Sequence, residues 1–220
     1  MIFSMPSTTN IDRPEEALAV ANRYHRRERT LTVVVAVVAV SLYLGVYYVT
    51  SLLPAVVTAV VLLVTVRAPL LQPRGTYRLK SDDDPEAVVD AFTGPTPPVL
   101  AFNWGIADEI TTREEEVTYH VSYLLGLRSA EMDVQREIDH TQNGRHRVTL
   151  EITANDKPWA TYTATISQKD GETSIDVEYI SNQRFGLQHV PNQFFGERYR
   201  EDALTAQGYT VLERESHFGI

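Results

Sequence analysis

An arginine stands at a position of a predicted strand that should face the protein interior. In the run from Met132 to Ile138 the apolar residues occupy every second position, and position 136 of this series is Arg. A buried guanidinium needs an acidic side chain or an anionic group of a ligand as its partner. The same residues therefore predict either a ligand cavity in which Arg136 binds an anionic group, or an ordinary core in which Arg136 pairs with a neighbouring Glu or reaches the sheet edge. Four tyrosines share this predicted interior face and could form the walls of the cavity: Tyr119, Tyr123, Tyr162 and Tyr179.

The other candidate reactive groups form no complete site. His140 and His146 flank the Asn143-Gly144 turn beside Asp139, but a zinc site needs a third positioned ligand that this spacing does not supply. The chain has no cysteine, no glycine-rich phosphate loop and no Gly-x-Ser-x-Gly motif. We therefore expect no catalytic residue, no metal and no cofactor.

The elements that must position Arg136 and the tyrosines form an antiparallel meander. After Glu116, apolar and polar residues alternate in successive runs separated by turn signals, which is typical of a sheet with one buried face. A long helix carries Phe195, Tyr199 and Ala203 on one stripe and can cover that face, so the predicted fold class is α+β. Around the meander, the pattern predicts strands at 75–80, 99–104 and 209–213 and helices at 85–92 and 192–206.

This order of elements, over residues 75–207, resembles the helix-grip fold of the START/polyketide-cyclase-like superfamily. The resemblance is one of topology, since that superfamily has no short diagnostic motif. The chain differs from it in having one short early helix and an extra C-terminal strand. The resemblance implies that an apolar or amphipathic small molecule binds between the sheet and the helix, in some members with chemistry added.

Residues 31–66 contain no charged side chain. As one helix they would extend about 54 Å, well beyond the roughly 30 Å hydrocarbon core of a bilayer, so two helices folded back on each other fit better. We predict a transmembrane hairpin over 31–72, with a break near Thr50-Ser51 and Pro54 in the first turn of the second helix. Basic residues flank only the open end of this hairpin, which predicts two passes through the cell membrane with both termini in the cytoplasm. They are Arg23, Arg26, Arg27 and Arg29 before the hairpin and Arg67, Arg74, Arg78 and Lys80 after it.

Small residues predict how the two spans pack. Ser41 and Gly45 are four residues apart in the first span, as are Ala55 and Ala59 in the second, so two small faces could meet at similar depth. Before the hairpin, a helix beginning near Pro14 carries the four N-terminal arginines. It either lies on the membrane surface, where its arginines bind anionic lipid headgroups, or is a flank that only sets the topology. Neither span holds a central acidic residue, Lys or His, so the hairpin alone is not expected to form a transporter.

The charge divides the chain into unlike parts. The whole chain carries −9, but residues 73–220 hold 14 basic and 25 acidic side chains, a net charge of −11. Such an acidic domain excludes a nucleic-acid binder with a basic surface. Only three lysines stand against 29 acidic residues, a composition that resembles proteins of halophilic archaea, where concentrated salt screens the repulsion. The alternative is an ordinary acidic mesophilic protein.

Three functional hypotheses follow from these features. The first is a membrane-anchored cytoplasmic module, in contact with membrane lipids, that binds an apolar or amphipathic small molecule or a partner protein. The second is a structural or assembly subunit, in which the hairpin packs against another membrane protein. The third is an enzyme of the helix-grip type, which no catalytic motif recommends. The predicted parts are an Arg-containing N-terminal segment at 1–30, the hairpin at 31–72 and the acidic domain at 73–220.

Overall fold

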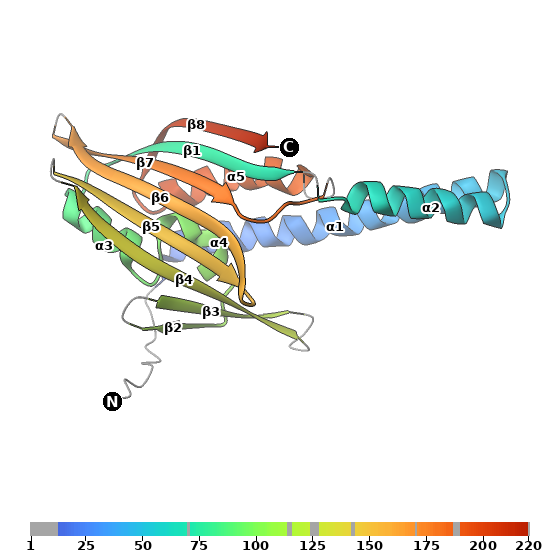
Figure 1. The fold of residues 1–220 in the computed structure, drawn as a ribbon, viewed down its shortest axis with the longest axis horizontal. Coiled ribbons are helices and arrows are strands. Elements are labelled where there is room, and N and C mark those ends of the chain that lie inside the picture. Colours follow the sequence, from blue (N-terminus) through green and yellow to red (C-terminus); the bar gives the residue numbers. More distant parts are fainter. Residues whose placement is uncertain are drawn as a thin grey trace.

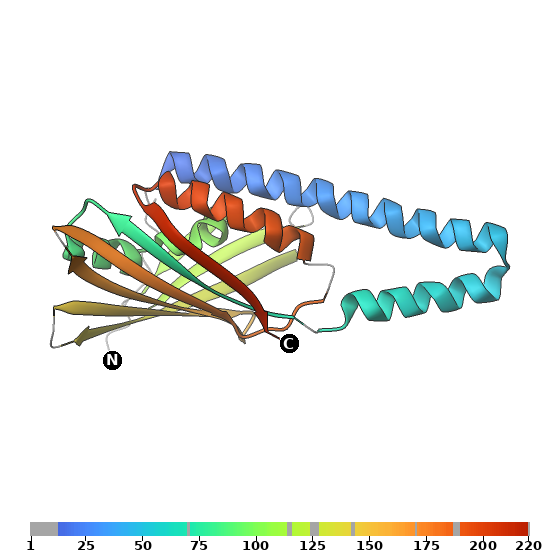
Figure 2. The same cartoon turned by 90° about the horizontal axis from the view of Figure 1, so that it is seen from above.

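A long helical hairpin projects from one end of an α+β domain (Figure 1). The computed structural model describes residues 13–69, 71–113, 116–123, 128–141, 144–169, 171–186 and 190–219. The hairpin and the domain share one helix, because the first helix starts against the domain and continues to the tip of the hairpin (Figure 2). The N-terminal part of α1 is therefore a structural part of the domain.

The hairpin consists of α1 (Glu15–Val49) and α2 (Leu52–Arg67), joined at Thr50 and Ser51 as the sequence predicts. The end of α1 is capped by Thr50, whose backbone N–H and side-chain hydroxyl both donate hydrogen bonds to the carbonyl of Val46, at 3.0 and 2.7 Å. Because α1 is uninterrupted, the predicted N-terminal helix and the first span are one element. The two helices diverge from the tip toward the domain (Figure 2).

Within the described residues, no helix combines the length and the apolar character needed to cross a membrane.

The domain is built on one antiparallel sheet with the strand order β2-β3-β4-β5-β6-β7-β1-β8. The meander from β2 to β7 follows the chain, while β1 pairs with β7 and carries β8 on its other edge. The predicted α+β class and the antiparallel meander are therefore confirmed. The strands are β1 (Gln72–Ser81), β2 (Glu109–Thr112), β3 (Glu116–Tyr123), β4 (Arg128–Thr141), β5 (Arg145–Ala154), β6 (Lys157–Lys169), β7 (Glu172–Ser181) and β8 (Thr210–Gly219).

The segment between β1 and β2 contains three helices. It contains α3 (Pro85–Thr93), the short helix η1 (Pro98–Leu100) and α4 (Ala101–Trp104). The predicted strand at 99–104 is therefore wrong. Leu100, Ala101 and Trp104 are buried at helical spacing, and a short apolar run does not distinguish a buried strand from a buried helix. A second early helix also removes one of the two differences from the helix-grip resemblance.

A three-layer arrangement encloses the core. The inward residues of the strands form one layer, α5 (Val190–Thr205) lies against them, and the N-terminal part of α1 lies on the outer side of α5 (Figure 2). Gly208 ends the last turn with a φ of +87°, and the Tyr209 N–H donates to the carbonyl of Leu204 at 3.1 Å, which reverses the chain into β8.

The contact between α1 and the domain depends on small residues. Ala17 and Ala21 are completely buried, and a Cβ added to Gly105 would lie only 2.7 Å from the Cβ of Ala21. Next to this contact the ring of Tyr24 stacks on Phe102 with 4.6 Å between centroids. Glycine at position 105 therefore lets α1 approach α4 closely enough for its aromatic residues to pack.

Candidate functional site

A buried arginine lies between α5 and the sheet, surrounded by tyrosines of three adjacent strands. Nη1 of Arg200 donates a hydrogen bond to the hydroxyl of Tyr77 on β1. The Cζ atom of Arg200 lies 5.7 Å from the ring centroid of Tyr77 and 5.4 Å from that of Tyr179 on β7. Tyr162 on β6 stacks on Tyr179 with 5.1 Å between centroids. We call these four residues the Arg200 cluster.

The strand register explains why these side chains converge. Tyr162 and Tyr179 are direct cross-strand partners, and Tyr179 is paired on its other side with Gly75. Tyr77 follows two positions after Gly75, so its side chain points to the same inner face. A helix residue placed above β6, β7 and β1 therefore meets three phenol rings at once.

The guanidinium of Arg200 is largely enclosed and has no acidic partner among the described residues. Its Nε atom is buried without a hydrogen-bond partner, although the residue as a whole keeps a small exposed fraction. No carboxylate among the described residues forms an ion pair with it, and the adjacent Glu201 instead lies 3.6 Å from Arg214. The cluster thus contains a positive charge for which the described residues supply no counter-ion.

The electrostatics of the cluster keep Arg200 charged and Tyr162 neutral. Burial by itself lowers the pKa of Arg200, but the oxygens of Tyr77, Tyr162 and Tyr179 outweigh it, so that the pKa is raised. Burial raises the pKa of Tyr162, and the positive charge of Arg200 offsets this only in part. At neutral pH the site therefore presents one cation among hydroxyl donors and acceptors.

The structure separates the tyrosines that the sequence grouped with Arg136. Tyr162 and Tyr179 belong to the Arg200 cluster, whereas Tyr119 lies near Arg136 and donates to the carbonyl of Pro95 at 3.0 Å. The side chain of Tyr123 lies outside the described residues. Burial raises the pKa of Tyr119, and the nearby Arg136 lowers it by less.

Arg136 donates to two backbone carbonyls, and its role as the anchor for an anionic group stays a prediction. Nη1 donates to the carbonyl of Thr93 at the end of α3, and Nη2 donates to the carbonyl of Arg113 at 3.1 Å. Burial lowers the pKa of Arg136. Because cations favour helix C-termini, Arg136 holds α3 and the β2–β3 connection against the sheet.

Sequence reasoning missed both Arg200 and Tyr77. A signal for Tyr77 existed, since Tyr77 and Leu79 alternate with polar residues in the predicted strand at 75–80 and both are buried. The sequence held no such signal for Arg200. It directly follows Tyr199 of the apolar stripe, and a charged residue beside an apolar stripe is normally predicted to face solvent. In the structure Tyr199 contacts Tyr24 of α1 while Arg200 faces the sheet, so α5 is covered on two sides.

The N-terminal arginines lie on the exposed side of α1. Arg23, Arg26 and Arg27 are exposed, and the Cζ atom of Arg27 lies 5.7 Å from the ring centroid of Tyr199. The side chain of Arg29 lies outside the described residues. The opposite side of α1 packs on the domain, and lipid contact by its arginines stays a prediction.

The packing of the hairpin differs from the prediction in its first helix. Ala55 is buried and Ala59 half-buried on α2, but Ser41 and Gly45 are exposed on α1. Nothing lies within 4 Å of a Cβ added to Gly45, so the prediction that the Ser41–Gly45 face meets α2 is wrong. Ser41 and Gly45 instead lie in an open groove of about 660 Å³ along α1, lined also by Val38, Leu42, Val46, Val49 and Thr50.

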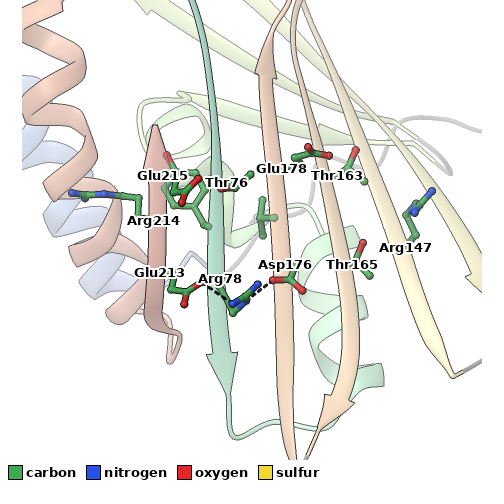
Figure 3. A pocket seen from close by; sticks show the side chains of 12 residues that line it. Thr76, Arg78, Arg147, Thr163, Thr165, Asp176, Glu178, Glu213, Arg214 and Glu215 are labelled. Carbon is green, nitrogen blue, oxygen red and sulfur yellow. Dashed lines mark hydrogen bonds and ion pairs between the residues drawn. The ribbon is translucent and has the colours of Figure 1, made fainter. Parts of the chain in front are cut away.

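The outer face of the sheet carries a second, polar groove of about 610 Å³ (Figure 3). Its centre is Arg78, which pairs with Asp176 at 2.9 Å and with Glu213 at 2.7 Å. The hydrogen bond to Asp176 and the charge of Glu213 raise the pKa of Arg78. These side chains are about half exposed, so the groove is a solvated ion-pair network in which the charge of Arg78 is already compensated.

The histidines of the β4–β5 hairpin do not complete a metal site in the described part of the chain. His140 and His146 are cross-strand partners, but no group of three candidate ligands occurs among the described residues. A different histidine, His120, lies 3.5 Å from the carboxylate of Glu131 on the outer side of the sheet.

Comparison with known proteins gives distant structural likenesses. No family model matches the chain, and no curated protein matches it. Mll3558 protein from Rhizobium loti is 17% identical over 62% of this chain and 96% of its own, with a TM-score of 0.41. A START superfamily protein from Mycobacterium smegmatis is 8% identical over 62% and 97%, with a TM-score of 0.39. A conserved protein from Geobacillus kaustophilus is 11% identical over 67% and 99%, with a TM-score of 0.36. Since each of these TM-scores is below 0.5, the description of the fold stands on the strand order and the helix positions.

Proposed function

We propose that this protein is a membrane-attached binding module whose α+β domain holds a small amphipathic molecule between α5 and the sheet. The Arg200 cluster carries the proposal, because it places a charged group and three phenols beside the apolar core of the domain. Polar groups are costly to bury without partners, and the Nε atom of Arg200 has none. A ligand that supplies the missing acceptor would remove this cost. The helix-grip topology implied by the strand order fits such a site.

Native mass spectrometry of the full-length protein from mild detergent tests this function. We expect one bound small molecule per chain, released when the protein unfolds. Ala164 lies beside Tyr162 on the inner face of β6 and is buried, whereas its neighbour Thr163 faces outward. Ala164→Phe should fill the interior and abolish the bound species, and Thr163→Phe should retain it. A folded Ala164→Phe protein with the same adduct would contradict the proposal.

The hairpin is the proposed attachment to the membrane. Its large apolar side chains are exposed at successive positions, among them Val37 (58%), Leu53 (77%) and Val61 (57%). A helix that is apolar on all sides needs an apolar surrounding, and bilayer lipid covers every side at once. The open end of the hairpin adjoins the domain (Figure 1). Leu71, four residues after the end of α2, forms a β-bridge with Phe185, whose ring contacts Trp159 with 5.6 Å between centroids. Aromatic residues of this kind suit the membrane interface.

Single-cysteine labelling tests how far the hairpin enters the bilayer, because the native chain has no cysteine. The proposed two-pass arrangement with both termini in the cytoplasm places Ser51 on the outer side. Ser51→Cys should then react with a membrane-impermeant maleimide added to intact cells, while Glu151→Cys in the domain should react only after lysis. Labelling of Glu151→Cys in intact cells, or of Ser51→Cys only after lysis, would contradict this topology.

A second candidate function is assembly with another membrane protein through the hairpin. The open groove at Ser41 and Gly45 favours this assembly function, because small residues allow another helix to approach closely and α2 does not pack against this face of α1. Gly45→Leu should then abolish copurification of the partner and leave the adduct in the domain unchanged. If the adduct is absent and a stoichiometric partner is present, assembly is the better description.

A further inference from the structure

The charge of Arg200 restricts what the interior site can bind. A guanidinium stays ionised even when buried, and removing it from water costs several kcal/mol unless an opposite charge lies close by. The two acids nearest in the described part of α5 do not supply that charge, since Glu201 pairs with Arg214 and Asp202 is exposed. The surrounding groups are phenols, and burial raises the pKa of Tyr162, which therefore stays neutral at neutral pH.

The geometry of the N–H donors shows which part of the Arg200 guanidinium already binds a protein group. Nη1 is occupied by the hydroxyl of Tyr77, and the rings of Tyr77 and Tyr179 contact the guanidinium through cation–π interactions. A ring face offers no acceptor to an N–H in the guanidinium plane. Nε is fully covered and has no hydrogen-bond partner in the described part of the chain. Nε and Nη2 lie on one edge of the guanidinium, the edge that binds both oxygens of a carboxylate in parallel.

The surroundings indicate the rest of the ligand. Tyr162 and Tyr179 present stacked rings, and Ala164, Ile175 and Val177 continue the inner face as a buried apolar surface. One guanidinium balances one negative charge, while a phosphate monoester would bring about 1.5 to 2 charges. Taking the proposed binding function as its basis, we infer that the ligand is an amphipathic monoanion whose carboxylate binds the Nε–Nη2 edge of Arg200 and whose apolar part lies along the inner face of β6 and β7.

Binding of a fluorescent polyene fatty acid and its methyl ester tests this inference on the full-length protein in nanodiscs, with empty nanodiscs as the background. The acid should bind about 10- to 100-fold more tightly than the ester, the range that a charged hydrogen-bonded pair supports. Arg200→Gln should weaken the acid by a similar factor and leave the ester unchanged. Arg198 is exposed on the same helix, so Arg198→Gln is the matched control and should bind both probes like the native protein.

The outcomes separate this inference from the function on which it rests. Equal affinities of the native protein for acid and ester would overturn the monoanion assignment and leave a neutral apolar ligand. An Arg200→Gln protein that binds the acid as tightly as the native protein would also overturn it. Absence of saturable binding by either probe would instead count against the binding function itself. If Arg200→Gln does not fold, the acid-to-ester ratio of the native protein and of Arg200→Lys decides, since Lys keeps the charge without the planar edge and should bind the acid with intermediate affinity.

Discussion

Replacing Gly105 with alanine tests whether α1 is a rigid part of the domain. Gly105 has a φ of −66°, so alanine can adopt its backbone conformation, and the effect of the substitution is purely steric. The added Cβ would lie 2.7 Å from the Cβ of Ala21 and 2.5 Å from the carbonyl oxygen of Ala101, where ordinary contacts begin near 3.4 Å. Either α1 or α4 must move. Overpacking of this kind costs about 1–3 kcal/mol, which lowers the unfolding midpoint of a chain of this length by about 2–12 °C.

Thermal unfolding of the full-length protein, followed by tryptophan fluorescence, measures this loss because Trp104 is buried next to Gly105. Gly45→Ala introduces the same methyl group where nothing lies within 4 Å and should not lower the midpoint. Ala21→Gly removes one of the two clashing atoms, so the double variant should lose less stability than the sum of the single variants, by about 0.5–2 kcal/mol. An unchanged midpoint for Gly105→Ala, or strict additivity with Ala21→Gly, would refute the close contact between α1 and α4.

Three further predictions concern the periphery of the domain. The backbone N–H of Ser122 donates to Asp108 at 2.6 Å and lowers the pKa of that carboxyl. Asp108→Ala should therefore reduce the unfolding midpoint above about pH 4, the usual carboxyl pKa, and its difference from the native protein should vanish as the pH falls through the lowered pKa. A difference that persists at pH 2 would contradict this. Arg136→Leu should destabilise the fold by about 1–3 kcal/mol in denaturant titrations, because the carbonyls of Thr93 and Arg113 lose their donor, and should leave ligand binding unchanged; weakened binding in a stable variant would restore Arg136 as an anchor. If the acidic, lysine-poor composition reflects a saline cytoplasm, the unfolding midpoint should rise from dilute buffer to molar KCl, and equal midpoints would leave an ordinary acidic protein.

The sequence predicts those elements whose pattern has one interpretation. The period-two alternation of the meander and the uncharged run at 31–66 give the sheet and the hairpin, with its break at Thr50 and Ser51. The run at 99–104 is too short and too uniformly apolar to distinguish strand from helix, and packing against α1 and α5 decides for helix. A sequence pattern also cannot show that α5 packs on two sides, against α1 at Tyr199 and against the sheet at Arg200.

The candidate site shows the same limit. Strand alternation correctly predicts that Tyr162 and Tyr179 face inward, because inward residues of neighbouring strands share one face. It also brings Arg136 to the inner side, but only the folded chain shows that Arg136 reaches two backbone carbonyls. Arg200, for which the described part of the chain supplies no counter-ion, comes from a helix distant in sequence. Its position depends on the packing of α5, which no local pattern encodes.

Photolabelling tests the central claim, binding between α5 and the sheet, most directly. The native full-length protein in nanodiscs is exposed to a fatty acid with a diazirine in its chain, irradiated and mapped by peptide mass spectrometry. The structure predicts labels on inward positions of β6 and β7, around Tyr162 and Tyr179, and on the α5 segment that carries Arg200, all removed by excess unlabelled acid. Labels confined to the hairpin and insensitive to that competition would show that the protein only partitions into lipid, and would contradict the interior site.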